Sequence, residues 1–257
     1  LFNSREEETM KKSLLYILAA AQILALWGCQ QKPKTKADPA KGYQFGQIAG
    51  PSVDKEIAFY RKKTERNPRG FLDKISLAGA YLSKAQFSGD TSFFVLAEKT
   101  AQDSLKLQKD GNTGALMILA SVNEARHEFG KSYELAKSVH DTGKSDLDSQ
   151  SIMTSSLVEL GRLEEATKLA EETFKAFPCS ASLMPLARCK IAVGKDEEAR
   201  KLLFRALKLE QPGERKLSAR LRSLLGEMEL RHGHPGEAGQ YFEAALQAQN
   251  SHAPALL

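Results

Sequence analysis

The feature that most constrains the fold of this chain is a pattern of large and small residues that returns about every 34 residues. Gly161, Gly194 and Gly233 each stand five residues before an alanine and eight residues after a large apolar side chain. Earlier copies of the pattern place the starts of five units near residues 71, 113, 147, 180 and 219. Apolar residues within the units fall at helical spacing, without the alternation typical of β-strands. The sequence therefore predicts an array of helical units.

Each unit fits two antiparallel helices. Small residues at unit positions 8, 20 and 27 let neighbouring helices approach closely, and large apolar residues at position 7 fill the space between them. Glycine at position 15 suits the end of the first helix. Position 7 is occupied by Leu77, Leu119, Met153, Leu186 and Leu225, and position 8 by Ala78, Ala120, Thr154, Ala187 and Gly226.

This pattern resembles the tetratricopeptide repeat (TPR), and the resemblance covers residues 71–252. It implies an all-α fold: an α-solenoid of antiparallel helix pairs, with about five TPR units and a leading helix, wound into a right-handed superhelix. The leading helix is expected from Asp54 to Glu65, ahead of Asn67-Pro68. The solenoid then occupies residues 53–257, with units near 71–112, 113–146, 147–179, 180–218 and 219–252.

Two units depart from the regular spacing. The first unit holds about seven extra residues, which we expect between its two helices in the Phe87–Phe94 region. The fourth unit holds about five or six extra residues after its second helix, around Pro212-Gly213. Pro185 is tolerated only in a first helical turn, which predicts that the helix containing it begins near Ser182.

The N-terminal segment resembles a bacterial lipoprotein signal peptide. Lys11 and Lys12 precede the apolar run Leu14–Trp27, which is shorter than the about 20 residues of a comfortable membrane span. The sequence Leu26-Trp27-Gly28-Cys29 resembles a lipobox, which implies that residues 10–28 are removed and that Cys29 carries the lipid. An uncleaved anchor helix with an incidental cysteine is the alternative. Residues 1–9 precede Met10, and we expect them to be upstream sequence that is not native, because Arg-Glu-Glu-Glu can be encoded by purine-rich codons.

The charge balance first suggests an anionic partner. Lys and Arg number 37 against 32 Asp and Glu, so the net charge is +5. Most of this excess lies in residues 29–52, a polar segment that we interpret as a flexible basic tether. Its lysines are placed to meet anionic lipid headgroups. We therefore expect no nucleic-acid partner.

The motifs of common enzymes are missing from the sequence. It contains no G-x-S-x-G, H-E-x-x-H or EF-hand pattern. His232 and His234 have only Glu237 nearby, whereas zinc takes three or four ligands, so we interpret them as solvated turn residues. Cys179 and Cys189 are about 10 Å apart along a helix, too far for a disulfide, and Cys189 is expected to be a packed thiol. We expect no metal, no cofactor and no enzymatic activity.

The first helices of the units should line the inner face of the solenoid. By the family resemblance, unit positions 2, 5, 9 and 12 point into a groove there. Position 2 is occupied by Leu72, Gly114, Asp148, Ala181 and Arg220. The candidate groove residues at positions 5, 9 and 12 are Ile75, Gly79, Leu82, Met117, Ser121, Glu124, Ser151, Ser155, Val158, Met184, Arg188, Ile191, Ser223, Glu227 and Leu230.

Two functions remain open at this point. The first is a non-enzymatic scaffold, lipid-anchored to a membrane of the bacterial cell envelope and facing the periplasm or the exterior, which binds a partner protein or peptide in its groove. Apolar groove centres with charges of both signs suit an extended or helical peptide. The alternative is the TPR portion of a longer protein with a catalytic or effector domain beyond residue 257, because Ala253–Leu257 reads like the start of a sixth unit.

Overall fold

The structure is a computed structural model that describes residues 52–143, 146–211 and 213–249. These residues all belong to one compact unit of the chain. The expected upstream residues 1–9, the signal peptide 10–28 and the tether, apart from Ser52, lie outside the described residues, as does the expected start of a sixth unit. Within the described ranges the secondary structure is entirely helical, as the sequence predicts.

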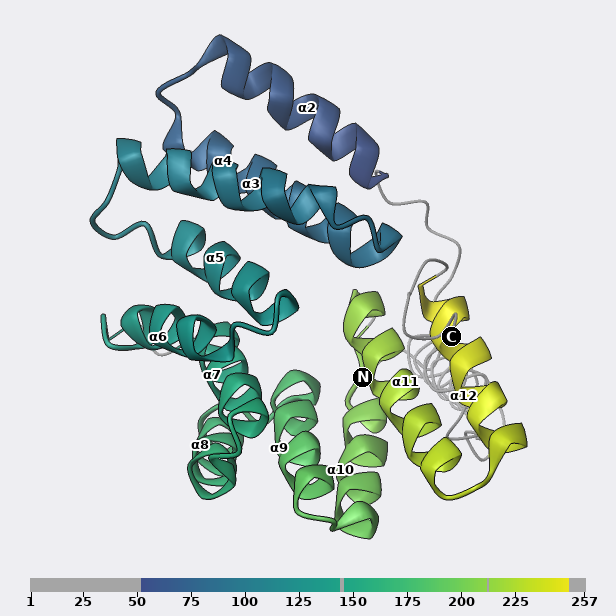
Figure 1. The fold of residues 1–257 in the computed structure, drawn as a ribbon. Coiled ribbons are helices and arrows are strands. Elements are labelled where there is room, and N and C mark those ends of the chain that lie inside the picture. Colours follow the sequence, from purple (N-terminus) through teal and green to yellow (C-terminus); the bar gives the residue numbers. More distant parts are fainter. Residues whose placement is uncertain (1–51, 144–145, 212, 250–257) are drawn as a thin grey trace, which may run out of the picture. The chain divides into compact units, whose positions relative to one another are not determined.

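A leading helix and five helix pairs follow one another along the chain (Figure 1). We call the first helix of each pair the A helix and the second the B helix. Each B helix packs on its own A helix, the B helices from α4 to α10 also pack on the next A helix, and successive A helices from α3 to α9 contact each other. The helices are α2 (Val53–Arg66), α3 (Phe71–Ser88), α4 (Ser92–Leu107), α5 (Thr113–Ala125), α6 (Phe129–His140), α7 (Leu147–Glu159), α8 (Leu163–Ala176), α9 (Ser180–Ala192), α10 (Asp196–Lys208), α11 (Arg215–Arg231) and α12 (Pro235–Ala248).

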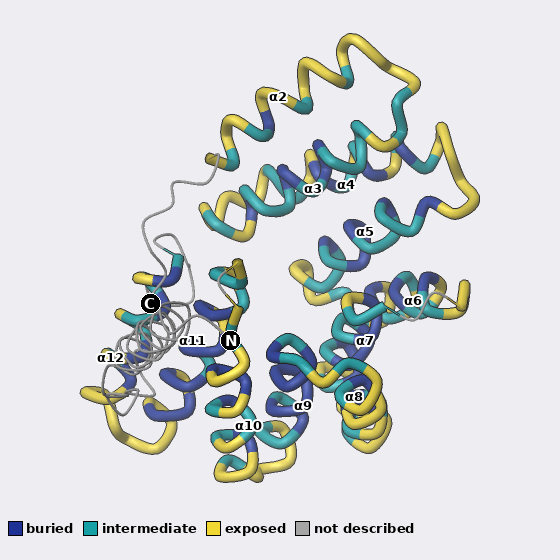
Figure 2. Tube along the Cα trace, turned by 180° about the vertical axis from the view of Figure 1, so that it is seen from behind, coloured by how far each residue is buried: buried dark blue, intermediate teal, exposed yellow. Residues whose placement is uncertain are grey.

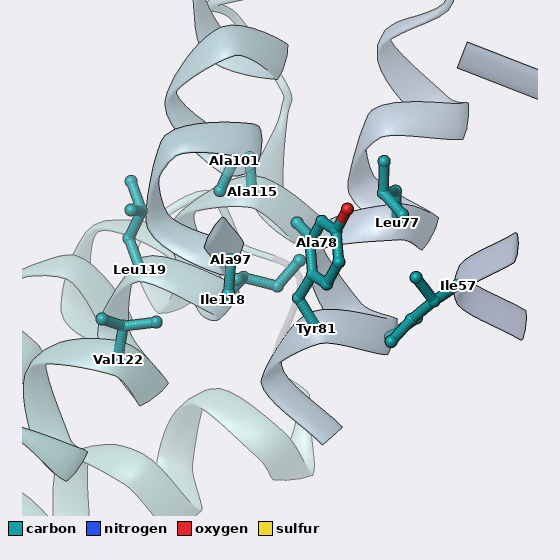
Figure 3. Packing of buried hydrophobic residues seen from close by; sticks show 11 residues of the cluster. Ile57, Leu77, Ala78, Tyr81, Ala97, Ala101, Ala115, Ile118, Leu119 and Val122 are labelled. Carbon is teal, nitrogen blue, oxygen red and sulfur yellow. The ribbon is translucent and has the colours of Figure 1, made fainter. Parts of the chain in front are cut away.

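The small residues of the repeat lie where helices meet. Ala78 and Ala187 at position 8, and Ala97 and Ala199 at position 20, have no exposed surface. Buried residues follow the contact faces of the helices, and exposed residues mark the turns between them (Figure 2). In the first core cluster, Tyr81 of α3 lies among buried residues of neighbouring helices (Figure 3). The packing therefore follows the spacing of small and large side chains.

The turn inside each pair requires a left-handed residue. Gly161, Gly194 and Gly233 end their A helices with φ of 74°, 73° and 79°, a region that favours glycine because it has no Cβ atom. His127 takes the same place in the second pair with φ of 60°. The second pair therefore keeps the turn geometry without glycine, at some cost in backbone strain.

The extra residues of the first unit lie mostly inside helices, and the expectation of a long linker was wrong. α3 continues to Ser88 and α4 begins at Ser92. In the same way α11 begins at Arg215, about one turn before the expected start of the fifth unit at residue 219. Both extensions contain buried side chains, Ala85 in α3 and Ser218 in α11, so packing continues the helices until Gly89 ends the first of them.

Pro185 also lies differently from the prediction. α9 begins at Ser180, two residues earlier than expected, so Pro185 falls in the second turn. Cys179 and Ser182 form a capping box, and the Ser182 hydroxyl donates to the carbonyl of Phe177. These bonds hold the first turn, and the missing N–H of Pro185 removes only one backbone bond.

Gly226 is the small residue whose replacement has the clearest consequence. A Cβ atom at this position would lie 2.7 Å from Cε1 of Phe242 on α12. We expect Gly226→Ala to lower the free energy of unfolding by about 1–3 kcal/mol, because the ring must shift in a packed interface. Urea denaturation measures this change. Gly239→Ala is the matched control, since its Cβ would meet no atom within 4 Å. Equal effects of the two substitutions would contradict the packing argument.

Candidate functional site

The A helices line a groove of about 1060 Å³, which we call the central groove. Its walls come from all five A helices, α3, α5, α7, α9 and α11, with Phe94 of α4 and Gln249 at its margin. Apolar side chains such as Met117 and Met184 lie beside charged ones such as Glu124 and Arg188. The groove is thus a chemically mixed surface rather than a closed apolar pocket.

Most of the candidate groove residues are brought together here. Asp148 and Arg220, at unit position 2, also line the groove. The candidates from positions 5, 9 and 12 that line it are Leu82, Met117, Ser121, Glu124, Ser151, Val158, Met184, Arg188, Ile191, Ser223 and Glu227.

The remaining four candidates lie elsewhere. Ile75 packs against the first core cluster, and Gly79 lines a shallow cleft between α2 and α3, because α2 covers that part of α3. Ser155 lines a small side pocket and accepts a hydrogen bond of 3.0 Å from Arg188. Leu230 is half exposed near the end of α11 and is not among the residues lining the groove. The repeat position alone therefore does not decide which side chains reach the groove.

One edge of the groove depends on residues that the sequence did not single out. Lys216 Nζ donates to Oε1 of Gln86 at 2.7 Å and lies 5.8 Å from the centre of the Phe87 ring. These residues stand on the two helical extensions, and they bring the end of α3 beside the start of α11 (Figure 1). The first and fifth helix pairs therefore meet across the groove. No local sequence signal pointed to this contact, because Gly89 and Pro212-Gly213 stand close to Gln86 and Lys216 and suggest helix ends there.

The charged side chains of the groove differ in whether an ion pair neutralises their charge. Arg188 donates to Glu159 at 2.9 Å, so its charge is paired. Removal of water by the groove walls raises the pKa of Glu227, although Arg188 and Arg231 oppose this shift. The same loss of hydration lowers the pKa of Arg220, against the attraction of Glu124. Among the described residues, Glu227 and Arg220 therefore lose part of their hydration without gaining a salt bridge in its place.

A second polar cluster lies at the turn between α11 and α12. Glu229 is buried, and its carboxylate contacts His234 Nδ1 at 3.0 Å and the Arg200 guanidinium. Glu237 lies 3.6 Å from the same ring nitrogen. His234 is a solvated turn residue, as the sequence predicts, with 55% of its side chain exposed, but the prediction did not foresee its contact with Glu229. Ligand atoms of Glu229, His234 and Glu237 lie within 4.8 Å of one another, but Arg200 and His234 already balance the buried carboxylate.

The balance around Glu229 predicts a pH dependence. Burial raises the pKa of Glu229, but His234 and Arg200 more than offset it, so the pKa lies below its ordinary value of 4.5. A lowered pKa in the folded state means that the charged form stabilises the fold above the ordinary value, and that this contribution disappears as pH falls through the folded value. We expect Glu229→Gln to cost about 1.5–3 kcal/mol at neutral pH. The difference in unfolding free energy between Glu229→Gln and the unsubstituted chain should shrink as the pH falls through the folded-state pKa of Glu229.

Denaturant unfolding at a series of pH values measures this dependence. The matched control is Glu237→Gln, since the Glu237 side chain is 63% exposed and its pairing is worth little. A difference between Glu229→Gln and the unsubstituted chain that stays constant from neutral to acid pH would contradict the assignment of a charged, paired Glu229.

The described cysteines, Cys179 and Cys189, are both free, in agreement with the sequence prediction. Cys189 is buried, and burial raises the pKa of its thiol. Among the described helices, none is both long and apolar enough to cross a membrane.

Comparison with solved structures identifies the fold of the described residues. No protein-family model and no curated protein sequence matches the chain. A tetratricopeptide repeat protein from Parabacteroides merdae covers 80% of this chain and 78% of its own, with 12% identity and a TM-score of 0.62. The described chain has a TPR fold. A thermophilic TPR protein from Thermus thermophilus covers 70% of this chain and 98% of its own, with 19% identity and a TM-score of 0.56. The five helix pairs are thus arranged like TPR units, and α2 precedes them.

Proposed function

We propose that this chain is a non-enzymatic protein-interaction scaffold that binds a segment of a partner protein in the central groove. The observation that carries the proposal is the groove itself, which all five A helices line with side chains of mixed chemistry. Curved helical solenoids offer such extended concave surfaces for binding. No cofactor is needed for this function.

The size and lining of the groove favour a peptide segment over a small molecule. Its volume of about 1060 Å³ lies at the upper limit of ligand pockets, which span roughly 300–1,000 Å³. Met117 and Met184 supply flexible apolar contacts that adapt to a side chain. Ser121 and Ser151 add hydroxyl groups to the same lining. An extended or helical segment can place apolar residues against the methionines and polar residues against the edges.

We further propose that the scaffold is tethered to a membrane of the bacterial cell envelope and faces the periplasm or the exterior. Support comes from the sequence Leu26-Trp27-Gly28-Cys29 and from the basic segment that follows it. A lipid on Cys29 would hold the chain at the surface, and the tether would let the TPR units reach a partner.

The groove function is tested by crosslinking the chain to its partners in its native cells and identifying them by mass spectrometry. We expect Met117→Glu combined with Met184→Glu to lose these partners, because a carboxylate in an apolar contact costs about 1–3 kcal/mol. The matched control is Leu160→Glu with Leu209→Glu, which adds the same charge at exposed residues outside the groove.

Folding must be checked, because Met184 is 8% exposed and Glu at this position could weaken α9. A melting curve of each variant makes this check. Ser121→Trp is a second groove variant that fills the space without adding a charge, and it should also lose the partners. If folded groove variants capture the same partners as the control variant, the groove is not the binding site.

A further inference from the structure

The side pocket that Ser155 lines adjoins the central groove and has a volume of about 70 Å³. Its walls come from α5, α7, α9 and α11. Glu124, Met184 and Arg220 line both the pocket and the groove, whereas Thr154 lines the pocket and not the groove. Because Thr154 is 1% exposed, the pocket leads from the groove toward the buried face of α7.

The size of the side pocket suits the end of one side chain. A water molecule in the bulk liquid occupies about 30 Å³, so the pocket holds roughly two or three non-hydrogen atoms. A stretch of main chain with its flanking residues is larger than that. A segment bound in the central groove can therefore place one side-chain end in the pocket while its main chain stays in the groove.

Opposite charges stand where the side pocket meets the groove. Glu124 on α5 attracts Arg220 on α11, but neither side chain forms a hydrogen bond or a salt bridge with a described residue. Arg188 also lines the pocket, and its donation to Ser155 at 3.0 Å and to Glu159 at 2.9 Å fixes its position. The pocket thus offers a ligand one hydrogen-bond acceptor, Glu124, and one donor, Arg220.

A buried hydroxyl in the wall of the side pocket also lacks a partner. Oγ1 of Thr154 has no hydrogen-bond partner among the described residues, although most buried polar side chains have one. Its apolar neighbours in the pocket, Ile152 and Val158, cannot provide it. The interior of the pocket therefore favours a polar side-chain end over an apolar one.

The chemistry of these groups distinguishes between polar side chains. Glu124 repels a carboxylate, and Arg220 and Arg188 repel an ammonium group. A carboxamide is neutral and carries an N–H donor and a carbonyl acceptor side by side. It can therefore donate to Glu124 and accept from Arg220 at the same time, and hydrogen bonds to charged groups are stronger than those between neutral groups.

Resting on the function proposed above, we propose that the side pocket is a specificity pocket for a carboxamide side chain, Gln or Asn, of the bound segment. The carboxamide donates to Glu124 and accepts from Arg220. Apolar residues on either side of it in the segment contact Met117 and Met184 in the groove. Because Glu124 and Arg220 stand on different helices, the pocket also fixes which residue of the segment lies at this point of the groove.

The first test is a selection from a library of random peptides on the immobilised chain. The peptides kept are those that no longer bind when Met117→Glu and Met184→Glu are combined, because these peptides use the groove. We expect them to share one Gln or Asn. Replacing that residue by Glu or Asp, which have nearly the same shape, should weaken binding about tenfold to a hundredfold.

Glu124→Gln should reverse this preference. The substitution removes the repulsion of a carboxylate and leaves Arg220 in place, so the Glu version of a selected peptide should bind this variant at least as tightly as the Gln version. The matched control is Glu134→Gln, at an exposed position on α6 outside the pocket and the groove, and it should keep the preference for Gln. Both peptides are compared on the same variant, so a loss of folded protein cannot produce a reversal.

The outcomes separate this inference from the function on which it rests. Groove-dependent peptides without a preferred Gln or Asn, or a preference that Glu124→Gln leaves unchanged, would overturn the carboxamide pocket and leave the groove function standing. Peptides that lose affinity on N-methylation of one main-chain amide, but not on replacement of any Gln or Asn, would assign the charges to the main chain and also overturn it. If no peptide depends on Met117 and Met184, both proposals fail.

Discussion

Glu210→Ala is expected to lower the free energy of unfolding by about 3–5 kcal/mol, because it leaves the Arg222 guanidinium buried without its carboxylate. Arg222 Nη1 donates to Glu210 Oε1 at 2.6 Å, and Nη2 donates to Oε2 at 3.1 Å. Both side chains are 1% exposed. Arg222 keeps a contact to the Ser218 carbonyl at 3.1 Å, but a neutral oxygen cannot balance its charge.

The effect should be concentrated in the C-terminal units. Glu210 follows α10 and Arg222 lies on α11, so the pair fastens the linker between the fourth and fifth units to the fifth A helix. Hydrogen exchange should show lost protection in α11 and α12 before α3 and α4, because TPR units depend mainly on their neighbours.

The matched control for this pair is Glu128→Ala. Glu128 pairs with Lys131 at 2.5 Å, but the side chains are 39% and 72% exposed. Its loss should have only a small effect in the same urea denaturation, because water screens an exposed pair. If Glu210→Ala and Glu128→Ala lowered the free energy of unfolding by similar amounts, burial would not be what makes the pair of Arg222 and Glu210 important for stability.

Cys29→Ala is expected to abolish the incorporation of labelled fatty acid into the protein, because the proposed lipid is attached to the Cys29 thiol, and to weaken its hold on the membrane. Each lipid CH₂ buried in a bilayer contributes about 0.8 kcal/mol, so loss of the proposed lipid would remove a large contribution to membrane affinity. The lysines of the tether would remain, but each contributes only about 1 kcal/mol near an anionic surface, and salt screens it.

The measurements are incorporation of labelled fatty acid and partition between detergent and water, after expression from Met10 in a bacterium that processes lipoproteins. Lys32→Gln with Lys34→Gln is the control, and it should leave the protein in the detergent phase because Cys29 is intact. If the unsubstituted chain stays in the detergent phase but incorporates no labelled fatty acid, the apolar run Leu14–Trp27 is an uncleaved anchor and the lipid assignment fails.

The helix pairs could be predicted because their information is local. A small residue such as Ala78 or Ala199 marks a close helix contact wherever it returns with the period, and a glycine such as Gly194 marks the turn. These signals depend on residues a few turns apart, so a single sequence carries them. The candidate groove residues Met117 and Met184 followed from the same register.

The features that escaped prediction depend on distant residues. Lys216 and Gln86 are 130 positions apart, and they meet only because the curvature of all intervening units brings α3 and α11 together. No short stretch of sequence encodes the combined curvature of these units. Glu229 is a similar case: its burial depends on Arg200 from another unit and on His234 beyond the turn. The early start of α9 depends on the capping contact of Ser182, which Pro185 alone did not reveal.

The central claim is that the groove, rather than the outer face of the B helices, holds the partner. A photo-crosslinking amino acid placed at Ser121, which lines the groove, tests this directly against one at Lys201 on α10, which is exposed and outside it. In native cells we expect a partner crosslink at position 121 and none at position 201. A crosslink at position 201 alone, or equal crosslinks at both positions, would contradict the account.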